Sequence, residues 1–157
     1  MKLYIKQQIF SWRDRFEVKE ENGSPKYYVE GEIFSWGKKL HVYDCFQHEV
    51  AYIEQRIFSF LPTYDIYVRN RNVARIVKEF TFLRPRYSIN TLNWEIDGSF
   101  WFHDYSVKEN GREIVNISKE WMTWGDSYEL DIRDTSRELE ALAVVLTIDC
   151  VIDQSRN

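Results

Sequence analysis

The sequence TSRELEALAVVLTIDCVI, from Thr135 to Ile152, decides the fold of this chain. Between Ala141 and Ile148 the most polar side chain is that of Thr147. A helix on a protein surface keeps a polar face, whereas a helix that is apolar all round is buried on every side. The apolar run is also much shorter than the roughly 20 residues that span a bilayer. We therefore expect a central helix with the rest of the chain wrapped around it.

The stretch is rich in β-branched residues, which in general favour strands. It is nevertheless too long for a typical strand of about five or six residues, and it lacks the alternation of a strand. Thr135 and Glu138 have the spacing of a capping box, in which each side chain bonds the other's free backbone N–H. The sequence predicts a helix over residues 135–152 that begins with this box.

The length of 157 residues indicates one domain with a single sizeable core. A formal charge of −4 argues against a general nucleic-acid binder, whose domains usually carry a basic excess. Residues 1–16 contain five charged side chains and no apolar core of a signal peptide. We expect a cytoplasmic protein without a transmembrane segment, either free or peripheral at a membrane.

The two cysteines, Cys45 and Cys150, lie far apart in the chain and lack the spacing of metal ligands. Cys150 falls on the helix that we expect to be buried. A buried free cysteine behaves as a small hydrophobic residue, and disulfides are rare in the cytosol. We predict two free thiols.

An internal repeat is the most informative pattern before the helix. Ile9-Phe10-Ser11-Trp12 recurs as Ile33-Phe34-Ser35-Trp36 and as Ile57-Phe58-Ser59-Phe60. A fourth copy of the same type is Trp121-Met122-Thr123-Trp124, and degenerate copies lie at Phe80-Thr81-Phe82 and Phe100-Trp101-Phe102. Ser11, Ser35 and Ser59 recur with the repeat, which indicates an architectural role in bonding backbone at strand ends.

Strand-like runs rich in Val, Ile and aromatic residues precede four of these copies, at Lys26–Ile33, Val50–Ile57, Val73–Phe80 and Glu113–Trp121. Turn residues such as Asn22-Gly23, Gly98-Ser99 and Asn110-Gly111 separate the runs. They leave room for about 12 strands of ordinary length before the helix. An eight-stranded barrel is filled by its own side chains, so a 12-stranded barrel leaves a hole. We predict a mainly β fold, a closed 12-stranded antiparallel barrel threaded by the C-terminal helix.

Four segments of the chain resemble the LURP-one-related family of the tubby C-terminal-like superfamily, in particular its bacterial members. They are Tyr27–Glu32 (YYVEGE), Gly37–Asp44 (GKKLHVYD), Trp124–Leu130 (WGDSYEL) and Ala141–Val151 (ALAVVLTIDCV). The resemblance extends over essentially the whole chain, residues 1–157, and implies a single domain with a 12-stranded barrel and a central helix. Superfamily relatives include tubby domains, which bind phosphoinositides, and phospholipid scramblases. Fold alone does not fix function.

No catalytic constellation is visible in the sequence, and no cofactor or metal is expected. His41, His48 and His103 are spread out without metal-ligand spacing. His103 and Asp104 are neighbours, and neighbours on a strand point to opposite faces. We therefore expect histidines with surface or structural roles.

Asp149 is an acid in the final turns of the buried helix. An unpaired carboxylate in an apolar interior is costly. One reading places Asp149 in a site at the mouth of the barrel. The other, which we favour, is a structural acid bonded to a Trp or Tyr donor or to water.

A basic cluster on one predicted hairpin is the best candidate for a binding surface. It comprises Arg69, Arg71, Arg75, Lys78, Arg84 and Arg86. Segregated positive charge attracts anionic headgroups or an acidic partner even when the net charge is negative. The alternative is an ordinary solvated hairpin.

These observations favour a non-enzymatic binding or tethering module that recognises anionic membrane lipid or a protein partner through its outer surface. Two alternatives remain open. A scaffold for a small apolar ligand is disfavoured because the helix should fill the barrel, and an enzyme is disfavoured because no catalytic constellation is visible.

Overall fold

The computed structural model describes residues 1–6, 15–32, 36–79, 86–90, 92–122 and 125–156. In these ranges the chain forms twelve strands, two short 3₁₀ helices and one α-helix. The strands are β1 (Lys2–Lys6), β2 (Phe16–Glu20), β3 (Pro25–Gly31), β4 (Lys39–Asp44), β5 (Glu49–Gln55), β6 (Thr63–Val68), β7 (Arg71–Glu79), β8 (Arg86–Asn90), β9 (Trp94–Ser99), β10 (Asp104–Glu109), β11 (Arg112–Met122) and β12 (Gly125–Ile132). The helices are η1 (Phe100–Phe102), η2 (Thr135–Arg137) and α1 (Glu138–Arg156). The predicted mainly β fold with a C-terminal helix is confirmed.

The strands form one antiparallel ring. Each strand pairs with its neighbours in the chain, and β1 also pairs with β12, so the strand order is that of a closed barrel. Met1 extends this closure, because its amino group donates to the carbonyl oxygen of Ile132 at 2.9 Å. Among the described residues, one registered pair, Ile89 with Trp94, joins β8 to β9.

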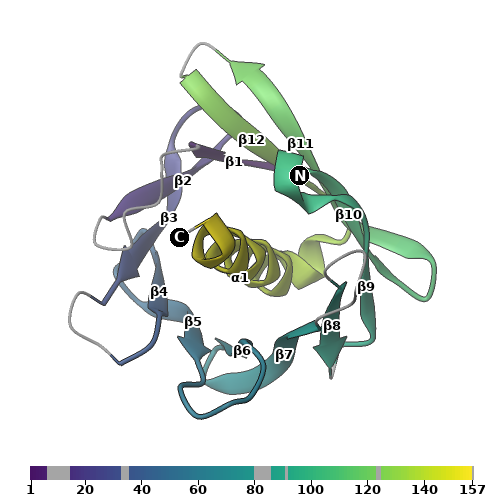
Figure 1. The fold of residues 1–157 in the computed structure, drawn as a ribbon. Helices are drawn as coiled ribbons and strands as arrows, with labels where there is room; N and C mark the ends of the chain where they lie inside the picture. Colours follow the sequence, from purple (N-terminus) through teal and green to yellow (C-terminus); the bar gives the residue numbers. More distant parts are fainter. Residues whose placement is uncertain (7–14, 33–35, 80–85, 91, 123–124, 157) are drawn as a thin grey trace.

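The helix α1 lies in the centre of the ring of strands (Figure 1). Every residue from Ala141 to Ile152 is buried. The surrounding strands present aliphatic side chains inward in register, as in the consecutive cross-strand pairs Val29–Val42 and Val42–Ala51. Opposed residues on paired strands share a face. The interior is therefore a continuous apolar lining packed around an apolar helix.

The start of the helix differs from the prediction. The carboxylate of Asp134 accepts a hydrogen bond from the backbone N–H of Ser136 at 3.1 Å and caps η2. The side chain of Glu138 instead accepts from the hydroxyl of Tyr27 at 2.8 Å. The predicted capping box of Thr135 and Glu138 is therefore wrong, because the Glu138 carboxylate is bonded to Tyr27, which is distant in the sequence. The helix also continues to Arg156, beyond the predicted end at Ile152.

The barrel has two different ends, because the links of an antiparallel ring alternate between them. Links after even-numbered strands lie at the end where α1 begins, which we call the entry end. Links after odd-numbered strands lie at the exit end, where α1 finishes. There Lys38 Nζ lies 2.9 Å from Asp153 Oδ2, and the hydroxyl of Tyr64 lies 3.0 Å from Gln154 Oε1. No helix in the described part of the chain is long and apolar enough to cross a membrane.

The described copies of the sequence repeat lie in or next to links at the exit end. Ile57-Phe58-Ser59-Phe60 follows β5, as the sequence predicts, although β5 ends two residues earlier than expected. Ser59 Oγ donates to the backbone oxygen of Arg56 at 3.0 Å, which agrees with the predicted architectural role. The fourth copy begins inside β11, at Trp121. Residues 9–12, 33–35, 80–82 and 123–124, which hold the other copies or parts of them, lie outside the described residues.

Candidate functional site

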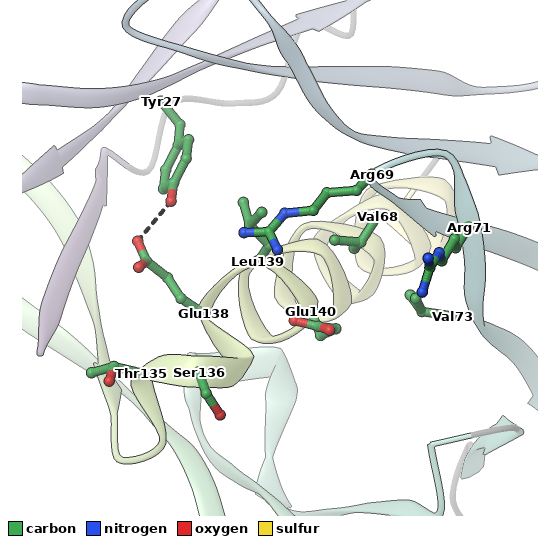
Figure 2. Close-up of a pocket in the computed structure, with 10 residues that line it drawn as sticks. All are labelled: Tyr27, Val68, Arg69, Arg71, Val73, Thr135, Ser136, Glu138, Leu139 and Glu140. Atoms are coloured by element: carbon green, nitrogen blue, oxygen red, sulfur yellow. Dashed lines mark hydrogen bonds between the residues drawn. The ribbon is translucent and has the colours of Figure 1, made fainter.

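A pocket of about 470 Å³ opens at the entry end, between the β6–β7 turn, β3 and the first turn of α1. Backbone and side chains of all three elements contribute to its wall (Figure 2). The lining residues are Tyr27, Val68, Arg69, Arg71, Val73, Thr135, Ser136, Glu138, Leu139 and Glu140. Two members of the predicted basic cluster, Arg69 and Arg71, thus meet the start of the central helix.

The β6–β7 turn positions both arginines. Val68 pairs with Arg71, which leaves Arg69 and Asn70 as a two-residue loop. Both have positive φ, 49° for Arg69 and 62° for Asn70. A type I′ hairpin turn requires this conformation at both positions and favours Asn and Gly there. Arginine in the left-handed region is strained, and such strain gathers at functional sites. Figure 2 shows the Arg69 side chain extending from the turn over the first turn of α1.

Both arginines are exposed. Within the described ranges, neither lies within 4.0 Å of a carboxylate as part of an ion pair. Of the two acids in the lining, Glu138 already accepts from the Tyr27 hydroxyl and lies 2.8 Å from Lys26 Nζ. Burial, followed by the bond to Glu138, raises the pKa of Tyr27, and the charge of Arg69 partly offsets that rise. The positive charge of the pocket is therefore available to a ligand.

The other members of the predicted cluster lie elsewhere. Arg75 extends from β7 to Asp65, with Nε 2.7 Å from Oδ1 and Nη2 3.2 Å from Oδ2. Lys78 is half-buried near the opposite end of β7, roughly 23 Å from Arg71 at about 3.3 Å per residue. Arg86 is paired with Glu79 in the register of β7 and β8. Arg84 lies outside the described residues. Only Arg69 and Arg71 share this pocket among the described members.

Asp149 belongs to a polar cluster inside the barrel. Its Oδ1 lies 3.0 Å from Nε2 of His103, and its Oδ2 accepts from the hydroxyl of Tyr128. The rings of His103 and Tyr128 stack with centroids 4.3 Å apart. The predicted Tyr donor is confirmed. His103 was not predicted as a partner, because 46 residues separate it from Asp149 and no local pattern links them.

His103 is buried whereas Asp104 is exposed, so this pair does not face one substrate, as predicted. His41 lies on the outer face, with Nδ1 2.6 Å from Glu49 and Nε2 2.9 Å from Glu32. In the part of the chain that the structure describes, no three His, Cys, Asp or Glu side chains gather as metal ligands.

The barrel with a buried helix and the matches to known proteins define the class of protein. The model of the LURP-one-related family matches residues 1–149, and this chain belongs to that family. It is 34% identical over 152 residues to the uncharacterised protein YxjI of Bacillus subtilis (strain 168), a match that covers 97% of this chain and 94% of YxjI. An X-ray structure of a protein from Arabidopsis thaliana has a similar fold, with a TM-score of 0.65 at 10% identity. That likeness covers 99% of this chain and 91% of the plant chain.

Proposed function

We propose that this protein is a non-enzymatic binding module whose entry-end pocket holds an anionic, phosphate-bearing ligand. One observation carries the proposal. Arg69 and Arg71 are exposed, line one pocket of about 470 Å³, and have no ion-pair partner among the described residues. Two cations left unpaired beside a concave surface favour recognition of an anion over a purely structural role.

The chemistry of the residues that line the pocket limits the class of ligand. Guanidinium groups match phosphate oxygens through paired N–H donors. Thr135 and Glu140 line the same pocket, and a hydroxyl and a carboxylate are groups that bond the hydroxyls of a ligand. A phosphorylated polyol offers both kinds of group. Its source is either a lipid headgroup, which the phosphoinositide-binding superfamily relatives favour, or a free phosphorylated molecule.

Isothermal titration with soluble inositol phosphates and glycerol phosphate tests the shared chemistry. Wild-type protein is expected to bind at least one of them, and the variant Arg69→Gln/Arg71→Gln is expected to lose at least about tenfold in affinity, because charge-assisted bonds contribute roughly 1.5–3 kcal/mol each. Arg112→Gln is the matched control, because Arg112 is an exposed arginine at the same end but outside the pocket lining.

A second measurement separates the two sources. Vesicles that contain phosphoinositide are compared with vesicles whose charge is matched by phosphatidylglycerol. If the ligand is a lipid headgroup, wild-type protein should bind the phosphoinositide vesicles more tightly than the charge-matched vesicles, and Arg69→Gln/Arg71→Gln should lose this preference. A free ligand gives binding in the titration and no such difference. If Arg69→Gln/Arg71→Gln changes the binding of none of the soluble ligands or vesicles, the proposal is wrong.

The two alternatives, a scaffold for a small apolar ligand and an enzyme, find less support. Residues 141–152 of α1 occupy the interior that an apolar ligand would need. The acid and histidine nearest to a catalytic arrangement are Asp149 on α1 and His103, and both are buried and lack the access that a substrate requires.

A further inference from the structure

Large hydrophobic side chains are exposed mainly at the exit end of the barrel. The structure describes seven such residues, and five of them lie in links at this end. Trp36 is 85% exposed, Phe58 97%, Phe60 101% and Phe102 74%, and Ile57 is also exposed. We call these five residues the aromatic rim. Exposed apolar side chains that gather in one region mark an interaction site more often than single scattered ones do.

The rim is built from separate turns. Trp36 lies between β3 and β4, Ile57, Phe58 and Phe60 lie between β5 and β6, and Phe102 follows across the ring between β9 and β10. A groove of about 1110 Å³ separates the first two turns, and its wall includes polar residues such as Glu54 and Arg75. The aromatic side chains thus stand on turns around one end of the barrel and do not form one closed apolar cleft.

Cations outnumber acids in the described links at the exit end. The described links at the exit end, with the strand residues that border them, carry five cations whose side chains the structure describes, namely Lys6, Arg15, Lys38, Lys39 and Arg56. The acids in the same set are Glu32 and Asp104. At the entry end, the β2–β3 and β4–β5 links with their bordering residues carry Glu20, Glu21, Asp44 and Glu49 and neither lysine nor arginine. The β6–β7 turn at the entry end carries Arg69 and Arg71, so the two ends are not of uniform charge. The aromatic rim itself stands among a local excess of cations.

We propose that the exit end docks on the surface of an anionic lipid bilayer, with the aromatic rim in the interfacial region and the surrounding cations against the headgroups. Tryptophan favours the membrane–water interface, and phenylalanine is common on surfaces that insert at the boundary of headgroups and acyl chains. Basic residues near an anionic leaflet add attraction. A second copy of the chain fits this end less well, because a two-fold contact places the same patch on both subunits and would bring the two sets of cations together.

This inference rests on other residues than the proposed ligand pocket, and of the two ligand sources it selects the free phosphorylated molecule. The pocket and the rim lie at opposite ends of the barrel, so a docked barrel presents Arg69 and Arg71 away from the bilayer. A protein held in this orientation takes its pocket ligand from solution, and it ties that ligand to the membrane surface.

Flotation with vesicles of phosphatidylcholine, with and without phosphatidylglycerol, tests the docking. Wild-type protein is expected to float with the anionic vesicles and to float less with the neutral ones. The variant Phe58→Ser/Phe60→Ser is expected to lose at least about tenfold in partitioning, because each aromatic side chain removed from the interface loses its apolar transfer energy. Near-UV circular dichroism checks that this variant keeps the wild-type fold, as exposed turn positions permit.

Two controls make the result specific. Phe46→Ser removes a phenylalanine that is 75% exposed in the β4–β5 link at the entry end, and it should float like wild type. Arg69→Gln/Arg71→Gln should also float like wild type on these vesicles, which separates the rim from the pocket. The inference is overturned if wild-type protein does not float, if the rim variant floats equally well, or if Phe46→Ser loses as much. Sedimentation could also show that wild-type protein is a dimer and that the rim variant is a monomer. That result would mean that the exit end contacts a second copy of the chain, and it would overturn the inference as well.

Discussion

The hydroxyl of Tyr128 on β12 donates a hydrogen bond to Oδ2 of Asp149 in the later turns of α1. His103 contacts the other carboxylate oxygen of the same acid. Aliphatic packing is not directional, whereas hydrogen bonds are. The bonds to Asp149 therefore help to fix the rotation and depth of the helix, together with the contacts of Glu138 and Asp153 with the strands.

Tyr128→Phe removes the donor and leaves Oδ2 of Asp149 without it. Since the group is buried, the free energy of unfolding is expected to fall by about 1–3 kcal/mol. Urea unfolding followed by fluorescence measures the change. Tyr43→Phe, at a half-buried position, is the control and should change stability by less than about 0.5 kcal/mol. An equal effect of the two substitutions would contradict an anchoring role for Asp149.

Leu142→Asp places a charge at a fully enclosed position of α1, where the leucine is 1% exposed. An unpaired buried carboxylate is costly enough to abolish cooperative folding of a domain with ordinary stability. Loss of the near-UV signal and of a cooperative thermal transition is expected. Asn93→Asp adds the same charge in an exposed turn and should fold normally. A cooperative transition in Leu142→Asp close to that of wild type would show that the helix is not the core.

The two thiols should differ in reactivity. Cys45 is exposed, and Cys150 is buried on α1. Burial raises the pKa of the Cys150 thiol, which removes the reactive thiolate. A thiol reagent such as Ellman's reagent is expected to modify Cys45 in the native protein and both cysteines after denaturation. In Cys45→Ser, rapid native labelling would place Cys150 outside the core and contradict the structure.

His41 gives the fold a pH dependence. Burial alone would lower the pKa of His41, but its hydrogen bonds to Glu49 and Glu32 outweigh that effect and raise the pKa above 6.5. The protonated form is thus favoured by folding. This stabilisation is complete below pH 6.5 and is lost as the pH rises through the raised pKa. Thermal unfolding across this range should show the advantage of wild type over His41→Gln shrinking with rising pH. A constant difference would mean that the carboxylates do not hold the imidazolium.

The overall architecture could be predicted because two strong patterns agree. A stretch from Ala141 to Ile152 that is apolar on all sides needs a surrounding shell, and the repeated strand-like runs supply one. The helix start could not be predicted, since the choice between Thr135 and Asp134 as the cap depends on Tyr27, which lies 111 residues from Glu138. Local spacing carries no information about such a partner.

The candidate site was predictable in part. The charge pattern points to Arg69 and Arg71, but the same pattern includes Arg75, whose charge is satisfied by Asp65 on the neighbouring strand. Sequence alone does not give the register that brings these two together. The sequence predicts an architectural role for the serines of the repeat, and it does not indicate whether the aromatic residues beside them are buried or exposed. Exposure at turns, as for Phe58, depends on where the strands end.

Closure of the ring between β1 and β12 also bears on how the protein is made. β1 leaves the ribosome long before its partner β12, and the helix that fills the interior follows β12. Until α1 emerges, the growing chain carries apolar strand faces with nothing to pack against and an unpaired edge that invites association. We therefore expect folding to wait until α1 has been synthesised, and the nascent chain to depend on chaperones in the meantime. Protease resistance of ribosome-bound chains that stop at Arg137 would contradict this order of events.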